Sequence, residues 1–157
     1  DLRATAEIVL DSSALNVHQL GNKISEVFAQ LSDRGIHLSL LSFGYKYGIP
    51  YDADFILDCR FIPNPHWVPE LQPLSGQDGA VAKMVLDNPA TKDFIKNFLH
   101  LFNGTKDGFL QEGKRYLTIA IGCTGGRHRS VAVSEFLANE FKNQKIDTTL
   151  NHRDLDR

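Results

Sequence analysis

Hydrophobic residues along the chain follow two different spacings, and each spacing predicts one kind of element. Short runs rich in β-branched and other apolar residues predict strands at 6–11, 36–43, 54–59, 113–122 and 146–150. Segments in which apolar residues recur every three or four positions predict helices at 17–31, 79–86, 91–102 and 128–143. Because these strands alternate with helices, the sequence predicts an α/β fold with a mostly parallel sheet and flanking helices.

The apolar stripes of three of these helices predict which side chains are buried. The expected stripes are Val17, Leu20, Ile24, Val27, Phe28 and Leu31; Phe94, Ile95, Phe98, Leu99 and Phe102; and Val131, Val133, Phe136, Leu137 and Phe141. The strand at 113–122 is the most apolar and is expected at the sheet centre. Four prolines in 60–77 predict a long structured loop without a regular element, and 151–157 reads as a polar tail.

Composition and charge narrow the class of protein. A chain of 157 residues, 42% hydrophobic and 23% charged, predicts one main core of an ordinary globular protein. No apolar run approaches the roughly 20 residues of a membrane span, and no secretory signal is visible, so no membrane partner is expected. Two cysteines are too few for a disulfide framework and favour the reducing cytoplasm. Residues 114–157 carry eight Lys and Arg against five Asp and Glu, whereas 1–113 carry nine against fourteen. The basic end suits an anionic ligand or a nucleic acid, or is only a solvated face.

The stretch "YLTIAIGCTGGRHRSVAVSEFLA" (116–138) joins the central strand to a helix through a glycine-rich turn. The first amides of a helix have no partner within the helix, and the helix dipole adds positive charge, so this turn predicts a phosphate site. Gly125 and Gly126 allow several amides to converge, and Arg129 adds a charge-assisted contact. Thr124 and Ser130 supply hydroxyl groups, although Ser130 is equally suited to a hydrogen bond within the first helical turn.

Cys123 begins the pattern C-x-x-G-x-x-R-S, which is the phosphate loop of cysteine-dependent phosphatases. A nucleophilic cysteine needs a thiolate and a general acid for the leaving group. Gly122 stands where that signature usually carries histidine, and the acid cannot be assigned: Asp52, Asp54 and Asp58 are merely available. The alternative is a small buried thiol at a strand end.

Two histidines are candidates for the same site. His128, at the start of the helix, is a phosphate contact, a base or simply exposed, and its polar neighbours argue against a core role. His66, in "NPHWVP", either reaches the anion site or is solvated while Trp67 anchors the loop. His18, His37 and His100 fit packing or exposure better than ligand binding. The histidines and cysteines lack the short spacings of a zinc site, so no metal is predicted.

Two segments together carry a resemblance to a known family. "SFGYKYGIPYDADFILDCRFIPNPHWVPELQPLSG" and the glycine-rich stretch above resemble the C-terminal domain of the RapZ/YvcJ family, which comprises RNase adapters and P-loop nucleotide-binding proteins. The likeness covers 36–157, and 1–34 resembles the end of that family's N-terminal P-loop domain or a linker. No G-x-x-x-x-G-K-[ST] motif occurs, so the ATPase or GTPase activity implied for the full-length protein is not expected of this chain.

The resemblance implies a cytoplasmic regulatory module without a cofactor, on a fold like a phosphofructokinase substrate domain. Its implied partners are a sugar phosphate such as glucosamine 6-phosphate, a small regulatory RNA, an endoribonuclease and a second copy of itself. Carried over residue by residue, the ligand pocket uses Thr124, Gly125, Gly126, His128, Arg129, Ser130, His66, Asp58 and Asn64. The implied RNA surface uses Lys46, Arg60, Arg127, His152 and Arg153. The family's RNA-binding members end in a strongly basic tail, whereas "NHRDLDR" has two Arg against two Asp, which should weaken RNA binding. A cysteine-dependent phosphatase and a purely structural partner-binding domain are the competing hypotheses.

Overall fold

The computed structural model describes residues 10–13, 15–17, 19–21, 24 and 35–157. The chain divides into two compact units, 1–34 and 35–157, and the second holds all the elements discussed below. The strand predicted at 6–11 and most of the helix predicted at 17–31 lie outside the described residues.

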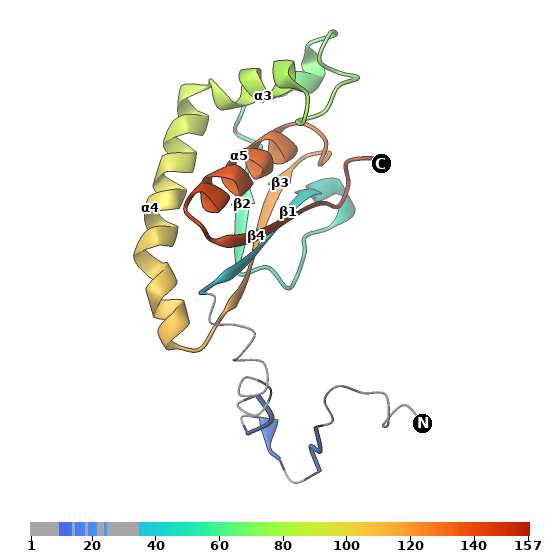
Figure 1. Ribbon diagram of the computed structural model, residues 1–157. Coiled ribbons are helices and arrows are strands. Elements are labelled where there is room, and N and C mark those ends of the chain that lie inside the picture. Colours follow the sequence, from blue (N-terminus) through green and yellow to red (C-terminus); the bar gives the residue numbers. More distant parts are fainter. Residues whose placement is uncertain (1–9, 14, 18, 22–23, 25–34) are drawn as a thin grey trace. The chain divides into compact units, whose positions relative to one another are not determined.

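The second unit is built on a four-stranded sheet in the order β2-β3-β1-β4 (Figure 1). The strands are β1 (His37–Gly44), β2 (Phe55–Asp58), β3 (Tyr116–Cys123) and β4 (Asp147–His152). All three pairings are parallel, which confirms the α/β fold and places the carboxyl ends of all four strands at one edge. The most apolar strand, β3, is one of the two interior strands, as predicted. In a parallel sheet, that carboxyl edge is where ligand sites form.

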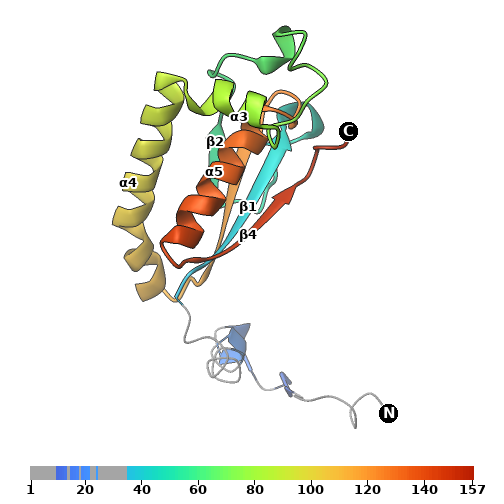
Figure 2. The ribbon, with the colours of Figure 1, turned by 45° about the horizontal axis from the view of Figure 1, so that its top comes forward.

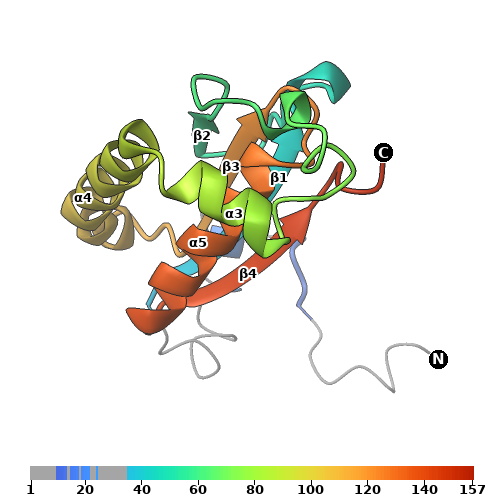
Figure 3. The ribbon, with the colours of Figure 1, turned by 90° about the horizontal axis from the view of Figure 1, so that it is seen from above.

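Three helices cover one face of this sheet (Figures 2 and 3). They are α3 (Gly79–Leu86), α4 (Pro89–Gln111) and α5 (Arg129–Asn143). The start of α4 follows from its sequence, because Pro89 suits the first helical position and the Asn88 side chain accepts from the Ala90 amide at 2.9 Å. The helix extends nine residues beyond the predicted 91–102, since Phe109 and Leu110 continue its apolar face onto the core.

The core lies between the sheet and these helices. The rings of Phe102 in α4 and Phe141 in α5 are 5.0 Å apart, and Phe55 of β2 packs edge-on against Phe98 at 5.8 Å. In the stripes of α4 and α5, three members are only partly buried, Phe94, Leu99 and Phe136, and the others are buried. The alternating pattern of β1 and the stripes of α4 and α5 therefore meet in one core. The burial predicted for the stripe at 17–31 is wrong for its described members Val17 and Ile24, which are 85% and 41% exposed.

Two predictions for the irregular segments need correction. The proline-rich loop contains a 3-10 helix, η2 (Pro65–Trp67), because the Asn64 side chain accepts from the His66 amide and caps it. The presumed polar tail, 151–157, begins within β4. Its Asp154 is fully buried and accepts a hydrogen bond from the Gly44 amide at 2.8 Å. A short 3-10 helix, η1 (Tyr45–Tyr47), follows β1.

Within the described residues, no helix is long and apolar enough to cross a membrane. The same part of the chain holds no group of three or more His, Cys, Asp and Glu side chains arranged to hold a metal ion.

Candidate anion-binding site

The glycine-rich turn between β3 and α5 lies at the carboxyl edge of the sheet. Its backbone packs tightly against β1, because a Cβ at Gly126 would lie 2.7 Å from the Gly44 amide nitrogen. Gly126 also has φ +79°, a conformation that side chains disfavour. The turn therefore requires glycine at this position, and it presents the residues on either side of Gly126 to a cavity.

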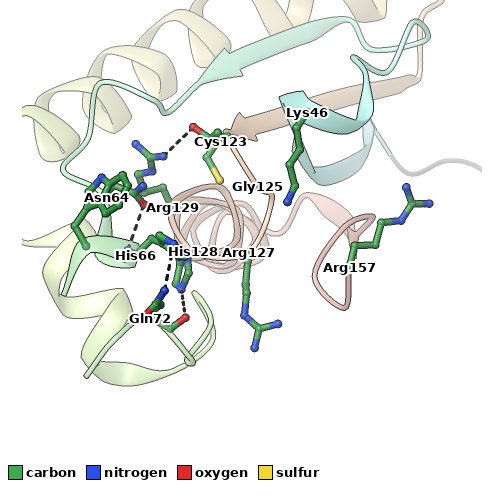
Figure 4. A pocket seen from close by; sticks show the side chains of 12 residues that line it. Lys46, Asn64, His66, Gln72, Cys123, Gly125, Arg127, His128, Arg129 and Arg157 are labelled. Atoms are coloured by element: carbon green, nitrogen blue, oxygen red, sulfur yellow. Dashed lines mark hydrogen bonds between the residues drawn. The ribbon is translucent and has the colours of Figure 1, made fainter. Parts of the chain in front are cut away.

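That cavity has a volume of about 430 Å³, and we call it the anion pocket (Figure 4). Its lining contains four Lys or Arg side chains, two histidines and no carboxylate. The lining residues are Lys46, Asn64, His66, Trp67, Gln72, Cys123, Thr124, Gly125, Arg127, His128, Arg129 and Arg157. A cavity of this size suits a small organic ligand.

Arg129 supplies a buried positive charge at the pocket. It is only 5% exposed, and its guanidinium donates to the carbonyls of Arg60 and Ile62 at 3.0 and 2.9 Å and to the Thr124 hydroxyl at 3.2 Å. Its Nε is buried and finds no acceptor in the described part of the chain. A buried guanidinium whose hydrogen bonds all go to neutral oxygens makes the site a candidate for binding an anion.

The backbone of the turn adds further donors. Among the described residues, the amides of Gly125, Arg127 and His128 have no hydrogen-bond acceptor. Arg129 is the first residue of α5, so these amides precede the positive end of the helix dipole. These three amides lie where the sequence predicts a phosphate site.

His128 differs from its predicted setting, because it is only 7% exposed. Its Nε2 lies 3.2 Å from the Gln72 carbonyl oxygen, and burial lowers its pKa from the ordinary histidine range. His66 lines the same pocket with its ring centroid 6.2 Å from that of His128, and its Nε2 lies 3.3 Å from the Gln72 side-chain nitrogen. The proline-rich loop therefore brings both histidines to the pocket.

Cys123 lies beneath the turn, at the end of β3. It is 2% exposed and belongs to the hydrophobic core. Its Sγ accepts from the Gly126 amide at 3.2 Å and lies 3.2 Å from the Ser130 hydroxyl. The Ser130 side chain is fully buried and pairs with this thiol instead of facing the pocket.

Three of the nine residues that the resemblance implied for the ligand lie outside the pocket lining: Asp58, Gly126 and Ser130. The Asp58 carboxylate pairs with Arg60, with Nη2 to Oδ2 at 2.6 Å, and this hydrogen bond lowers the pKa of Asp58. The other six line the pocket. Reasoning from the sequence did not assign Arg157, Gln72 or Trp67 to it, and it placed Lys46 and Arg127 on the RNA surface instead.

Most of the implied RNA surface is engaged within the protein. Arg127 donates to three carbonyls, those of Leu74, Pro73 and Leu155, at 2.9–3.1 Å. Arg153 donates to the carbonyl oxygens of Gly44 and Gly48 and to Asp154, and His152 bridges Ser42 and Glu135. Arg60 pairs with Asp58 and stacks over the Tyr45 ring at 3.9 Å. Lys46 makes neither an ion pair nor a side-chain hydrogen bond with any described residue.

Comparison with known proteins points to one group of proteins. A family model described as the RapZ C-terminal domain matches residues 36–156. Two curated proteins, each named "Nucleotide-binding protein", match the whole chain: one from Nocardioides sp. is 48% identical over 157 residues, and one from Streptomyces griseus is 49% identical over 157 residues. The chain covers 52% of the first and 47% of the second, so it spans about half the length of these relatives.

Proposed function

Because the chain belongs to the family of the RapZ C-terminal domain, we propose that it is a regulatory module whose anion pocket binds a phosphorylated small metabolite. A sugar phosphate such as glucosamine 6-phosphate is the proposed ligand class. The phosphate lies against the glycine-rich turn, where it accepts hydrogen bonds from the free amides of Gly125, Arg127 and His128 and neutralises the charge of Arg129.

The observation that carries this proposal is the charge of the lining, four cationic side chains without a carboxylate. Charge-assisted hydrogen bonds to phosphate are about twice as strong as neutral ones, and they gain strength in a recessed site of low dielectric constant. Some cations elsewhere in the domain pair with carboxylates, as Lys114 does with Asp54 and Arg60 with Asp58. The absence of a carboxylate from the described pocket lining supports binding of an anionic ligand there.

A phosphoesterase reaction at the same turn is less well supported. A cysteine nucleophile needs an acid that protonates the leaving group, and no carboxylate is among the described lining residues. Cys123 is also only 2% exposed and packs within the hydrophobic core. Binding without hydrolysis fits these contacts better.

The wider form of the proposal adds a small regulatory RNA, presented to an endoribonuclease. The exposed, unpaired Lys46 beside the pocket favours it, since phosphate contacts supply most of the affinity for nucleic acid. Arg60, Arg127 and Arg153 already bond to the protein, so few cations remain for an RNA backbone.

The decisive experiment places a carboxylate in the pocket without disturbing the fold. A Cβ at Gly125 would meet only the Lys46 side chain, at 4.0 Å, so Gly125→Asp and its neutral counterpart Gly125→Asn both fit. A ligand that binds only the folded protein raises the melting temperature. We expect glucosamine 6-phosphate to raise it for the wild type and for Gly125→Asn, and to have no effect on Gly125→Asp.

Calorimetric titration of the three proteins checks the same order of affinities. Equal binding by the Asp and Asn variants would place the ligand elsewhere on the domain. Failure of the wild type to bind glucosamine 6-phosphate and other sugar phosphates at millimolar concentration would overturn the proposal.

A further inference from the structure

We propose that Lys46 and Arg157 form a second anion-binding subsite of the anion pocket, so that sugar phosphates with a second anionic group bind more tightly than monophosphates. This inference rests on the proposed function, since it assumes that the first anionic group, a phosphate, lies against Arg129 and the turn amides. Within the proposed ligand class, it favours bisphosphates, or phosphates that also bear a carboxylate, over monophosphates such as glucosamine 6-phosphate.

The cationic side chains of the pocket are divided between two regions. Figure 4 shows Arg129, with His66 and His128, on one side of the turn that carries Cys123 and Gly125, and Lys46 and Arg157 on the other. All of them line one cavity of about 430 Å³, which exceeds what a single phosphate group needs. A ligand filling this cavity therefore reaches both regions.

The two regions differ in how their cations are engaged. Arg127 and Arg129 each donate to three oxygen atoms of the protein, so they act mainly through their charge. The Lys46 ammonium has no hydrogen-bond acceptor among the described residues. Arg157 has one charged neighbour there, with its Nε 3.5 Å from Asp154 Oδ1, and its two terminal nitrogens have no acceptor in the same part of the chain. Lys46 and Arg157 thus provide the unused donors.

Tyr47 brings these two cations together. The Lys46 ammonium lies 4.7 Å from the centre of the Tyr47 ring, and the Arg157 guanidinium carbon lies 5.2 Å from the same centre. The two charges are therefore at most about 10 Å apart, which is close to the screening length at 0.1 M salt. An anionic group that binds near Tyr47 therefore interacts with both cations.

The placement of Arg157 depends on a buried anchor. Asp154 is fully buried, accepts from the Gly44 amide at 2.8 Å and pairs with Arg153 at 2.8 Å. A Cβ at Gly126 would come within 2.9 Å of the Asp154 side chain, so the anchor also contacts the glycine-rich turn. The residues after β4 are thus packed against the pocket itself, and they bring Arg157 to its edge.

The test compares sugar phosphates with and without a second anionic group. All three ligands carry a phosphate on C6. Glucose 6-phosphate has no second anionic group, 6-phosphogluconate adds a carboxylate, and glucose 1,6-bisphosphate adds a second phosphate. We expect the bisphosphate to bind the wild type about tenfold more tightly than the monophosphate, as measured by calorimetry. The double variant Lys46→Gln/Arg157→Gln should reduce that ratio of dissociation constants to about one to two.

A matched control removes the same charge elsewhere. The variant Lys96→Gln/Lys142→Gln replaces two exposed lysines outside the pocket lining and should keep the tenfold ratio. A ratio near one in the wild type, or a ratio that the Lys46/Arg157 variant leaves unchanged, overturns the inference while the proposed function stands. If neither these three sugar phosphates nor glucosamine 6-phosphate binds, the proposed function itself fails.

Discussion

Gly76 connects the proline-rich loop to the start of α5, and its replacement by alanine is expected to be severely destabilising. The added Cβ would lie 2.2 Å from the His128 carbonyl oxygen, 2.4 Å from the Ala132 amide nitrogen and 2.7 Å from the Val131 Cβ. The first two atoms form the first hydrogen bond of α5, at 3.0 Å, so neither can move without breaking the helix start. Overpacking of a buried site typically costs about 1–3 kcal/mol, and contacts with fixed backbone atoms place this variant at the upper end, at about 3 kcal/mol.

The assay is urea unfolding followed by circular dichroism, which yields the free energy of unfolding. Gly79→Ala is the matched control, because a Cβ there meets nothing within 4 Å and the position begins α3. We expect the control to keep or gain up to about 1 kcal/mol, since alanine restricts the unfolded chain. The Gly76→Ala variant should also lose sugar-phosphate binding, because displacing the start of α5 moves His128 and Arg129 away from their places in the pocket. A Gly76→Ala protein within about 0.5 kcal/mol of the wild type would refute the reasoning from these contacts.

Three further predictions concern the anchor, the buried histidine and RNA. Burial alone would raise the pKa of Asp154, but hydrogen bonds from Arg153 and the Gly44 amide hold it below the usual range. Asp154→Asn should therefore cost about 2 kcal/mol of unfolding free energy at pH 7, and the difference from wild type should close below about pH 4, as the folded-state carboxylate protonates. Burial lowers the pKa of His128, so the unfolded chain takes up its proton first, and stability should fall as the pH drops below about 6.5. His128→Gln should show a smaller loss between pH 7 and pH 5 in urea titrations, and an unchanged pH dependence would contradict this. If a small RNA binds, gel shifts at several salt concentrations should give the slope of log affinity against log salt concentration. Lys46→Gln should make this slope shallower by about 0.7–0.9, and an unchanged slope would show that Lys46 does not contact the RNA.

The sequence predicted the elements of the fold where local pattern and tertiary burial agree. The strand predicted at 36–43 lies within one residue of β1, and the helix predicted at 79–86 coincides with α3. Both predictions hold because each element presents one continuous apolar face to the core. The end of α4 was missed, since Gly104 and Gly108 resemble helix breakers. In the structure the helix continues through both, because Phe109 and Leu110 pack against the core. Tertiary contacts decided what the local pattern left open.

From the local pattern alone, the candidate site was predictable only as far as its residues are close in sequence, and the family resemblance added His66 and Asn64. The strand–turn–helix pattern alone located Thr124, Gly125 and Arg129, because a turn before a helix always presents free amides. Lys46 and Arg157 lie 111 residues apart, and nothing local relates them. They come together because β1 and β4 are paired neighbours and Asp154 joins the end of one to the end of the other. Such a meeting is a property of the sheet order, which a single sequence does not specify.

The same glycine-rich turn also explains how a phosphatase-like motif can serve binding alone. The pattern C-x-x-G-x-x-R-S requires a turn whose amides converge, an arginine that faces the anion and a small residue beneath. Here Arg129 and the amides meet those requirements, and Cys123 fills the position beneath the turn, in the core and hydrogen-bonded on two sides. Hydrolysis needs in addition a general acid. The described lining offers no carboxylate for that role, and burial lowers the pKa of His128, which disfavours its protonated form. Positive charge at both ends of the cavity stabilises a bound anion in its ground state, and such uniform binding gives affinity without accelerating a reaction.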